Sequence, residues 1–227
     1  MSTTLILGAS RGIGLELARQ CTAAGDRVIA TARSDDGLVR LRDIGAEVLR
    51  LDVAEPASIS GLSWQLDGER IDTAWYVAGQ MCRRTDARLP PAQLDFDRVM
   101  HANVLGAMQA IPQVAPLVEA SQAPGGGCFG FISSTMGRIT DVGGSNAWLY
   151  RTSKAALNMA VAAGRHSYPK ALFVLFHPGW VRTDMGGPQA AVSVGDSATH
   201  LRATLAGATA ADNGAFFNHD GSRITGW

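Results

Sequence analysis

The residues Leu5-Ile6-Leu7-Gly8-Ala9-Ser10-Arg11-Gly12-Ile13-Gly14 join a short apolar run to a stretch with a helical pattern. In this spacing the first glycine permits a tight turn off a strand, the second lets the backbone approach a pyrophosphate, and the third lets the helix pack on the strand. The helix N-terminus then presents free N–H groups to the phosphates. Because the turn follows a first strand and opens a helix, it predicts a dinucleotide-binding site rather than a purely structural turn. The expected cofactor contacts are Gly8, Ser10, Arg11, Gly12, Ile13 and Gly14.

Short apolar runs and helical patterns alternate along the rest of the chain. The predicted strands cover residues 3–7, 27–31, 47–51, 72–77, 126–133, 171–177 and 215–218. The predicted helices cover residues 13–24, 35–44, 56 to about 66, 96–119, 148–166 and 195–206, with a kink or break expected at Pro116. Strands that alternate with helices imply a parallel sheet. We therefore predict an α/β fold, a Rossmann-type, doubly wound, mainly parallel seven-stranded sheet with helices on both faces.

Length and composition are those of an ordinary globular protein. The 227 residues include 46% hydrophobic and 18% charged residues, and 20 basic residues balance 20 acidic ones. Such a balance favours neither a nucleic-acid nor a membrane partner. Three widely spaced cysteines, Cys21, Cys82 and Cys128, suggest a reducing cytoplasm and no metal site. No linker or repeat divides the chain, so we expect one domain over residues 1–227.

The end of the second predicted strand bears on the choice of dinucleotide. An acidic residue there would bind a ribose 2′-hydroxyl and repel a 2′-phosphate. The chain has Thr31-Ala32-Arg33-Ser34 instead, and Arg33 with Arg11 could clamp a 2′-phosphate. This favours NADPH over NADH, although two aspartates follow at once. Asp52 and Val53, after the third strand, are expected to meet the cofactor, and a helix N-cap is the alternative for Asp52.

Tyr150 and Lys154 stand four residues apart at the start of the predicted helix 148–166. Residues with this spacing lie on one helix face. An ammonium beside a phenol favours the phenolate, so we expect Lys154 to lower the pKa of Tyr150. That would make the tyrosine a proton donor and acceptor near neutral pH. On its own the spacing also fits a solvated helix face.

Together these motifs resemble the short-chain dehydrogenase/reductase family in its single-domain form, over essentially the whole length. The resemblance rests on residues 8–14, Asn103-Val104-Leu105-Gly106, Ile132-Ser133-Ser134, Tyr150-Arg151-Thr152-Ser153-Lys154 and Pro178-Gly179-Trp180-Val181-Arg182-Thr183. Residues 214–221 look like the closing strand of the small carbonyl-reductase branch, similar to C-factor and sniffer-type proteins.

The resemblance implies a catalytic tetrad. Tyr150 would be the general acid or base, Lys154 would bind the nicotinamide ribose, and Ser134 would hydrogen-bond the substrate oxygen. Asn103 would bend its helix and hold a water that links Lys154 to solvent. Ser133 is an alternative to Ser134, and Asn103 could be merely a polar helix residue.

The resemblance also implies further cofactor contacts, at Ala78, Gly79, Pro178, Gly179, Val181 and Thr183. One departure affects this region. The family commonly has Asn-Asn-Ala-Gly where this chain has Tyr76-Val77-Ala78-Gly79. The missing asparagines would remove hydrogen bonds that brace the central sheet and the catalytic helix.

The substrate pocket is expected to draw on residues 81–84, 136–148 and 180–192, with Met136, Trp148 and Trp180 as apolar walls. Arg83, Arg84 and Arg138 could attract an anionic substrate or be solvated surface charges. The resulting hypothesis is an NADPH-dependent oxidoreductase that reduces an aldehyde or ketone to an alcohol. The alternative is a C-factor-like NAD(P)-binding signalling protein with little turnover. A homodimer or homotetramer is expected by resemblance only.

Overall fold

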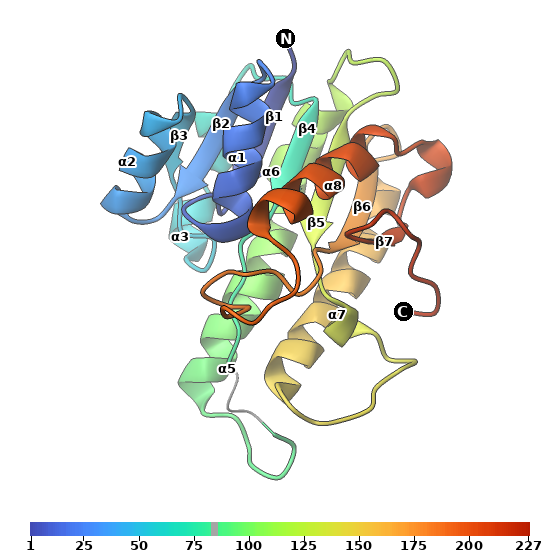
Figure 1. Cartoon of the computed structure of the whole chain (residues 1–227). Helices are drawn as coiled ribbons and strands as arrows, with labels where there is room; N and C mark the ends of the chain where they lie inside the picture. The colour runs from blue at the N-terminus through green and yellow to red at the C-terminus, as the bar shows by residue number, and fades with distance from the viewer. Residues whose placement is uncertain (83–85) are drawn as a thin grey trace.

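Seven parallel strands form the centre of the computed structural model, which describes residues 1–82 and 86–227 (Figure 1). Their order is β3-β2-β1-β4-β5-β6-β7, and every pairing between neighbours is parallel. The strands are β1 (Thr3–Leu7), β2 (Arg27–Ala32), β3 (Glu47–Arg50), β4 (Thr73–Tyr76), β5 (Cys128–Ile132), β6 (Leu172–His177) and β7 (Phe216–Asn218). The predicted fold class is therefore confirmed.

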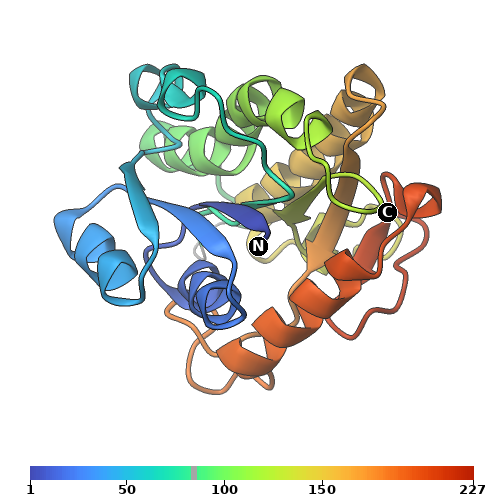
Figure 2. The ribbon, with the colours of Figure 1, turned by 90° about the horizontal axis from the view of Figure 1, so that it is seen from above.

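Helices cover both faces of the sheet (Figure 2). One face carries α3 (Pro56–Ile59), α4 (Leu62–Gln65), α6 (Gly106–Glu119) and α7 (Trp148–Gly164). The other face carries α1 (Gly12–Ala23), α2 (Asp35–Asp43) and α8 (Val194–Ala206). The helix α5 (Gln93–Met100) lies beside α7, and both extend beyond the carboxyl edge of the sheet (Figure 1).

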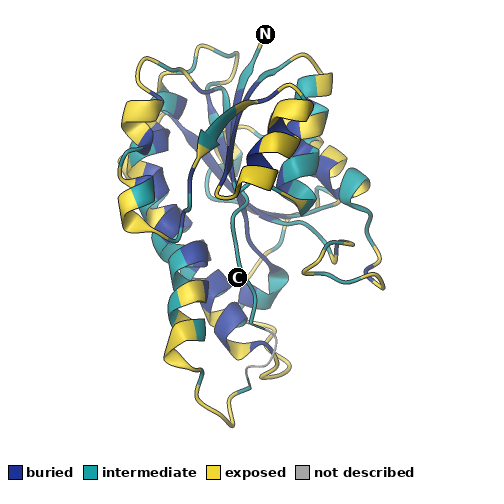
Figure 3. Ribbon diagram, turned by 90° about the vertical axis from the view of Figure 1, so that its left-hand side faces the viewer, coloured by how far each residue is buried: buried dark blue, intermediate teal, exposed yellow. Residues whose placement is uncertain are grey.

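Strand side chains alternate between two hydrophobic cores, one on each side of the sheet. Leu5 and Leu7 of β1 enter the core beneath α6 and α7, whereas Ile6 enters the core beneath α1 and α8. Because a strand has a period of two and both faces are covered, its residues read as an unbroken apolar run. Figure 3 shows the buried inner faces of the helices and their exposed outer faces.

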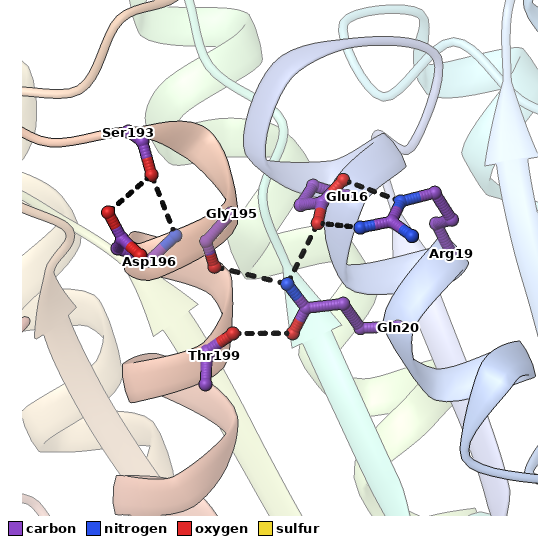
Figure 4. A network of polar contacts seen from close by, with 7 residues as sticks. All are labelled: Glu16, Arg19, Gln20, Ser193, Gly195, Asp196 and Thr199. Atoms are coloured by element: carbon purple, nitrogen blue, oxygen red, sulfur yellow. Dashed lines mark hydrogen bonds and ion pairs between the residues drawn. The ribbon is translucent and has the colours of Figure 1, made fainter.

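The helices α1 and α8 are joined by a polar side chain as well as by packing (Figure 4). The Gln20 amide nitrogen donates to the Gly195 carbonyl oxygen at 3.1 Å, and its amide oxygen accepts from the Thr199 hydroxyl at 3.1 Å. Gln20 also donates to Glu16 at 2.8 Å, within α1. The amide thus fixes α8 against the helix that begins at the glycine turn.

The structure corrects two expectations about helices. The predicted helix from residue 56 to about 66 is two short helices, α3 and α4. Of the predicted kink or break at Pro116, the break does not occur, since α6 runs through Pro112 and Pro116. Both prolines lie on the exposed face, where water can satisfy the carbonyls that lose an N–H partner. The irregularity comes earlier, as a π-helical turn at His101–Leu105.

Gly130 in β5 sets a limit on core packing. A β-carbon at this position would lie 2.7 Å from the Trp75 ring. We predict that Gly130→Ala lowers the free energy of unfolding by about 1–3 kcal/mol, because the ring is buried and cannot retreat. Urea unfolding measures this. Gly143→Ala is the control, since nothing lies within 4 Å of its β-carbon, and it should change stability by less than about 0.5 kcal/mol. Equal stability of the two variants would contradict the packing argument.

Candidate active site

A cavity of about 550 Å³ opens at the carboxyl ends of the strands. The chain passes from β1 outward to β3 and returns to β4 on the other side of β1. Ligands of open α/β sheets bind at such a switch point. The predicted site residues that line the cavity are Gly8, Ser10, Arg11, Gly12, Ile13, Arg33, Asp52, Val53, Ala78, Gly79, Tyr150, Lys154, Pro178 and Thr183. Ser133, the alternative to Ser134, and Ile132 beside it also line the cavity, whereas Ser134 and Asn103 are not among its lining residues. Gln80 and Ala102 line it as well, and the sequence does not indicate them.

The glycine turn has the geometry that its spacing predicts. Gly8 has a φ of +92°, and a β-carbon there would lie 2.7 Å from the Ala78 backbone. A β-carbon at Gly14 would lie 2.3 Å from the Gly8 carbonyl oxygen. The helix α1 begins at Gly12, and its N-cap residue Arg11 makes no side-chain capping bond. Its first N–H groups therefore have no side-chain cap, and the residues present fit the phosphates of a dinucleotide.

Two predicted residues pair with each other at the β2–β3 side of the cavity. An Arg33 guanidinium nitrogen lies 3.6 Å from an Asp52 carboxylate oxygen. Asp52 also accepts from the Ala54 backbone N–H at 3.0 Å, whereas the N-cap of α3 is Glu55. Asp52 therefore stabilises the turn before α3 and does not cap that helix.

The second arginine of the predicted clamp points elsewhere. Arg11 also lines the cavity but pairs with Asp184, at 2.9 Å. A different arginine lies at the turn, because Arg40 of α2 donates to the Ser10 carbonyl oxygen at 3.1 Å. Gly37 permits this approach, since a β-carbon there would lie 2.8 Å from the Ser10 β-carbon. Nothing in the local sequence pattern singles out Arg40, which lies inside a helix.

Tyr150 and Lys154 are both buried on α7. The Lys154 ammonium donates to the Ile132 carbonyl oxygen at 2.8 Å and lies 5.7 Å from the centre of the Tyr150 ring. Burial lowers the pKa of Lys154 to about 7. Burial also raises the pKa of Tyr150 to about 12, against a smaller lowering by a hydrogen bond with Ser134. The expected net lowering of the Tyr150 pKa is wrong, because desolvation disfavours the charged forms of both groups.

The two adjacent serines have different partners. Ser134 is buried, interacts with Tyr150 in a way that lowers the tyrosine pKa, and accepts from the Met136 N–H at 3.1 Å. The Ser133 hydroxyl donates to the Asn158 amide oxygen. Of the two serines, Ser134 is therefore the one beside the tyrosine hydroxyl.

Asn103 lies fully buried in the π-helical turn and holds two segments together. Its amide oxygen accepts from the Gln80 N–H at 2.7 Å, and its amide nitrogen donates to the Gln80 carbonyl oxygen at 2.9 Å. The same nitrogen donates to the Ser153 hydroxyl at 2.8 Å. Both amide hydrogens are thus bound by protein acceptors, so Asn103 is more than a polar helix residue. It connects the loop after β4 to the residue next to Lys154.

The loop that follows β6 is held by its own polar contacts. The Trp180 indole donates to the Gly186 carbonyl oxygen at 2.9 Å, and Thr183 accepts from the Gly186 N–H at 3.0 Å. Val181 is buried and forms a bridge with Val192. A β-carbon at Gly179, which has a φ of +84°, would lie 3.0 Å from Val192. This frame supports Pro178 and Thr183 at the cavity wall, whereas Gly14, Gly179 and Val181 are not among the lining residues.

The predicted apolar walls do not share the cavity of Tyr150. Met136 and Trp148 line a second cavity of about 570 Å³, together with Ala87 and Arg138. Trp180 is 57% exposed and lines neither cavity. Arg138 pairs with Asp141 at 2.5 Å. Arg83 and Arg84 lie outside the described residues. The sequence positions of Met136, Trp148 and Trp180 indicate which segments lie near the site. They do not indicate which of the two cavities each side chain enters.

No helix in 1–82 or 86–227 is long and apolar enough to cross a membrane. Over the same ranges, no group of three or more His, Cys, Asp or Glu side chains could hold a metal ion.

Comparison with known proteins gives the family. The family model described as short chain dehydrogenase matches residues 2–192. The chain belongs to the short-chain dehydrogenase/reductase family. This oxidoreductase is 30% identical over 233 residues to a 1-hydroxy-2-glutathionyl-2-methyl-3-butene dehydrogenase from Rhodococcus sp. (strain AD45), covering 98% of both chains. It is 33% identical over 132 residues to the C-signal protein of Myxococcus xanthus, covering 57% of this chain and 78% of the relative.

Solved structures extend the similarity to the whole fold. The carbonyl reductase Sniffer of D. melanogaster matches with a TM-score of 0.90 at 25% identity, over 100% of both chains. A short-chain dehydrogenase/reductase from Burkholderia multivorans with bound NADP matches with a TM-score of 0.84 at 30% identity, over 98% of both chains. The predicted resemblance to the family is thus confirmed.

The burial of Lys154 makes stability depend on pH. In the unfolded chain a lysine keeps its proton to about pH 10.4, whereas buried Lys154 loses it near pH 7. Between these values the unfolded state binds the extra proton, so the free energy of unfolding should rise with pH, by up to about 1.4 kcal/mol per unit. Below about pH 7 both states are protonated, and this contribution becomes flat.

Urea unfolding at pH values between about 7.5 and 9.5 tests this contribution. Lys154→Met should lose the part of the slope due to this residue. The other lysine of the chain, Lys170, is exposed, so Lys170→Met should keep the wild-type slope. A wild-type slope in Lys154→Met would contradict the neutral, buried lysine.

Proposed function

We propose that this protein is an NADPH-dependent carbonyl reductase that converts an aldehyde or ketone to an alcohol. The observation that carries the proposal is the place of Tyr150 in the cavity that begins at the glycine turn, where the Lys154 ammonium lies 5.7 Å from its ring centre and the Ser134 side chain interacts with it. Two hydroxyl donors at one point are suited to a carbonyl oxygen that gains negative charge. The similar structures named as a carbonyl reductase and as an NADP complex support the same activity.

The protonation of Tyr150 suits the reduction direction. Its pKa of about 12 keeps the proton on the phenol at neutral pH, where it can be donated to an alkoxide. Ser134 would donate a second hydrogen bond to the same oxygen. Lys154, with a pKa near 7, carries a partial positive charge at neutral pH and would stabilise the phenolate left after proton transfer.

The dinucleotide would extend from the glycine turn to Tyr150. Bound NADPH supplies the hydride that is added to the carbonyl carbon. The N–H groups at the start of α1 would hold its pyrophosphate, and Asp52 and Val53 would lie at the adenine end. Ala78, Gly79, Pro178 and Thr183 would line the nicotinamide end, with Gly179 and Val181 supporting that loop from behind.

The preference for NADPH over NADH rests on charge at the end of β2. Arg33 lines the cavity with its side chain 59% exposed, and no acidic residue occupies the strand end. Its partner Asp52 is 3.6 Å away, which is longer than a direct charge-assisted hydrogen bond. A 2′-phosphate would offer Arg33 a closer and more highly charged partner. Arg40 adds a second positive charge on the Ser10 side.

We also propose that the chain forms one domain and assembles as a homodimer or homotetramer. The unbroken sheet from β3 to β7 supports one domain over residues 1–227. The homodimer or homotetramer rests on the family resemblance alone.

The direct test is NADPH oxidation, followed by absorbance, with a panel of aldehydes, ketones and quinones. We expect turnover of at least one class. Tight NADPH binding without turnover of any compound would overturn the reductase. That result would favour an NAD(P)-binding signalling protein, the alternative that the similarity to the C-signal protein motivates.

We predict that Tyr150→Phe lowers the reduction rate by about 10²- to 10⁴-fold while NADPH binding stays within about twofold, because only the proton donor is lost. Ser134→Ala should lower the rate by about 10²- to 10³-fold. Stopped-flow reduction and NADPH fluorescence titration separate the two effects. Tyr168→Phe, on the Phe173 ring away from the cavity, is the matched control and should retain the wild-type rate. Full activity in Tyr150→Phe would remove this residue from the mechanism.

For the cofactor preference, Arg33→Ala should weaken NADPH binding by about 10- to 100-fold, as expected for a lost hydrogen bond between charged groups. NADH binding should change by less than about threefold, since NADH lacks the 2′-phosphate. Calorimetric titration with each dinucleotide measures both. Arg42→Ala removes an exposed arginine from α2 and controls for the loss of net charge. Equal weakening of both cofactors in Arg33→Ala would refute the 2′-phosphate contact.

A further inference from the structure

Tyr76 at the end of β4 makes a polar contact that the chemistry proposed above does not use. The residue is fully buried, and its hydroxyl donates to the Ala102 carbonyl oxygen at 2.8 Å. It pairs with Leu7 of β1 on one side and with Phe131 of β5 on the other. The hydroxyl is therefore fixed to the strand that lies between the glycine turn and the serine strand.

The acceptor lies in an irregular part of the helix. Ala102 belongs to the π-helical turn His101–Leu105, which separates α5 from α6. A π-turn is wider than an α-turn and departs from the regular i→i−4 bonding. A hydroxyl that donates to a carbonyl within this turn stabilises the wide form. The π-turn thus depends on a partner outside the helix.

Space for the hydroxyl is provided by a glycine. A β-carbon at Gly106 would lie 2.5 Å from the Tyr76 hydroxyl oxygen and 2.5 Å from the Val53 carbonyl oxygen. Burial, with a smaller effect of the Asp52 charge, raises the pKa of Tyr76, so the hydroxyl remains a donor at working pH. The hydroxyl thus lies between β4 and the helical stretch that contains both Ala102 and Gly106.

Asn103 follows directly after the carbonyl that Tyr76 holds. Its amide binds the Gln80 backbone through two hydrogen bonds and the Ser153 hydroxyl through a third. Gln80 and Ala102 both line the cavity, and Ser153 precedes Lys154. A shift of Ala102 would therefore move Asn103, and with it the loop and the helix that carry the proton-transfer residues.

We propose that Tyr76 is a positioning residue for the reaction. Its hydroxyl holds the π-helical turn in the form that orients Asn103. It replaces the bracing that the family's asparagines would give at the end of β4. The inference rests on the proposed carbonyl reduction, since its kinetic effect is exerted through Asn103 on Lys154 and Tyr150.

The kinetic test compares Tyr76→Phe, Asn103→Ala and the double variant with the wild-type protein. Tyr76→Phe should lower kcat on the order of tenfold, with the KM for NADPH within about twofold, as for a displaced catalytic group. In the Asn103→Ala background the same change should have no further effect on kcat, because the hydroxyl acts through Asn103. An unchanged kcat in Tyr76→Phe, or a full additive loss in the double variant, would overturn the proposal. Tyr168→Phe, the third tyrosine of the chain, is the control.

Amide hydrogen exchange tests the brace without any substrate, so its outcome is independent of whether the protein reduces a carbonyl. In Tyr76→Phe the Gln80 amide should lose about tenfold more protection than the core amides of β1 and β5. Equal loss throughout would mean that Tyr76 only contributes global stability, and the proposal would fail. If Tyr76→Phe does not fold, the wild-type protein decides. In the wild-type protein the amide of Gln80 and the amides of residues 101–106 must then exchange as one unit, with equal protection factors. A difference in protection above about tenfold would overturn the proposed role of Tyr76.

Discussion

The active-site edge depends on the contact between two pieces of backbone, the turn after β1 and the turn after β4. A β-carbon at Gly8 would lie 2.7 Å from Ala78, so no residue with a side chain fits there without displacement. This contact places the start of α1 beside the loop that Asn103 holds, and residues of both segments line the cavity. Because β4 lies between β1 and β5, the same contact also fixes the distance from the glycine turn to the serine strand.

Desolvation explains the electrostatics of the proposed proton-transfer pair. It moves the pKa of Tyr150 up and the pKa of Lys154 down. Between the two pKa values, about 7 and about 12, both groups are mainly uncharged. In that range neither group needs a counter-ion to be buried. A charge brought into the cavity would act on this pair in a medium that screens poorly, so its influence would exceed that of any surface charge.

The sequence alone predicts the sheet, the glycine turn and the tyrosine–lysine face, because each depends on spacing within a short segment. Contacts between distant segments are not encoded in this way. Tyr76 stands where the family has asparagine, and its brace becomes visible only when Ala102 is placed above it. Arg11 matched a phosphate clamp in sequence but pairs with Asp184. Burial reversed the expected direction of the Tyr150 pKa, since sequence spacing carries no measure of solvent exposure.

The Arg11–Asp184 pair has a consequence for the lining of the cavity. The two side chains are 67% and 77% exposed, and they join the glycine turn to the loop after β6. Ion pairs in water of this kind contribute roughly 0–1 kcal/mol, which is comparable to thermal energy. The pair therefore breaks and re-forms readily, beside a cavity that both side chains line. Rising ionic strength would weaken the pair further, so the positions of these two cavity residues depend on the surrounding solution as well as on the protein.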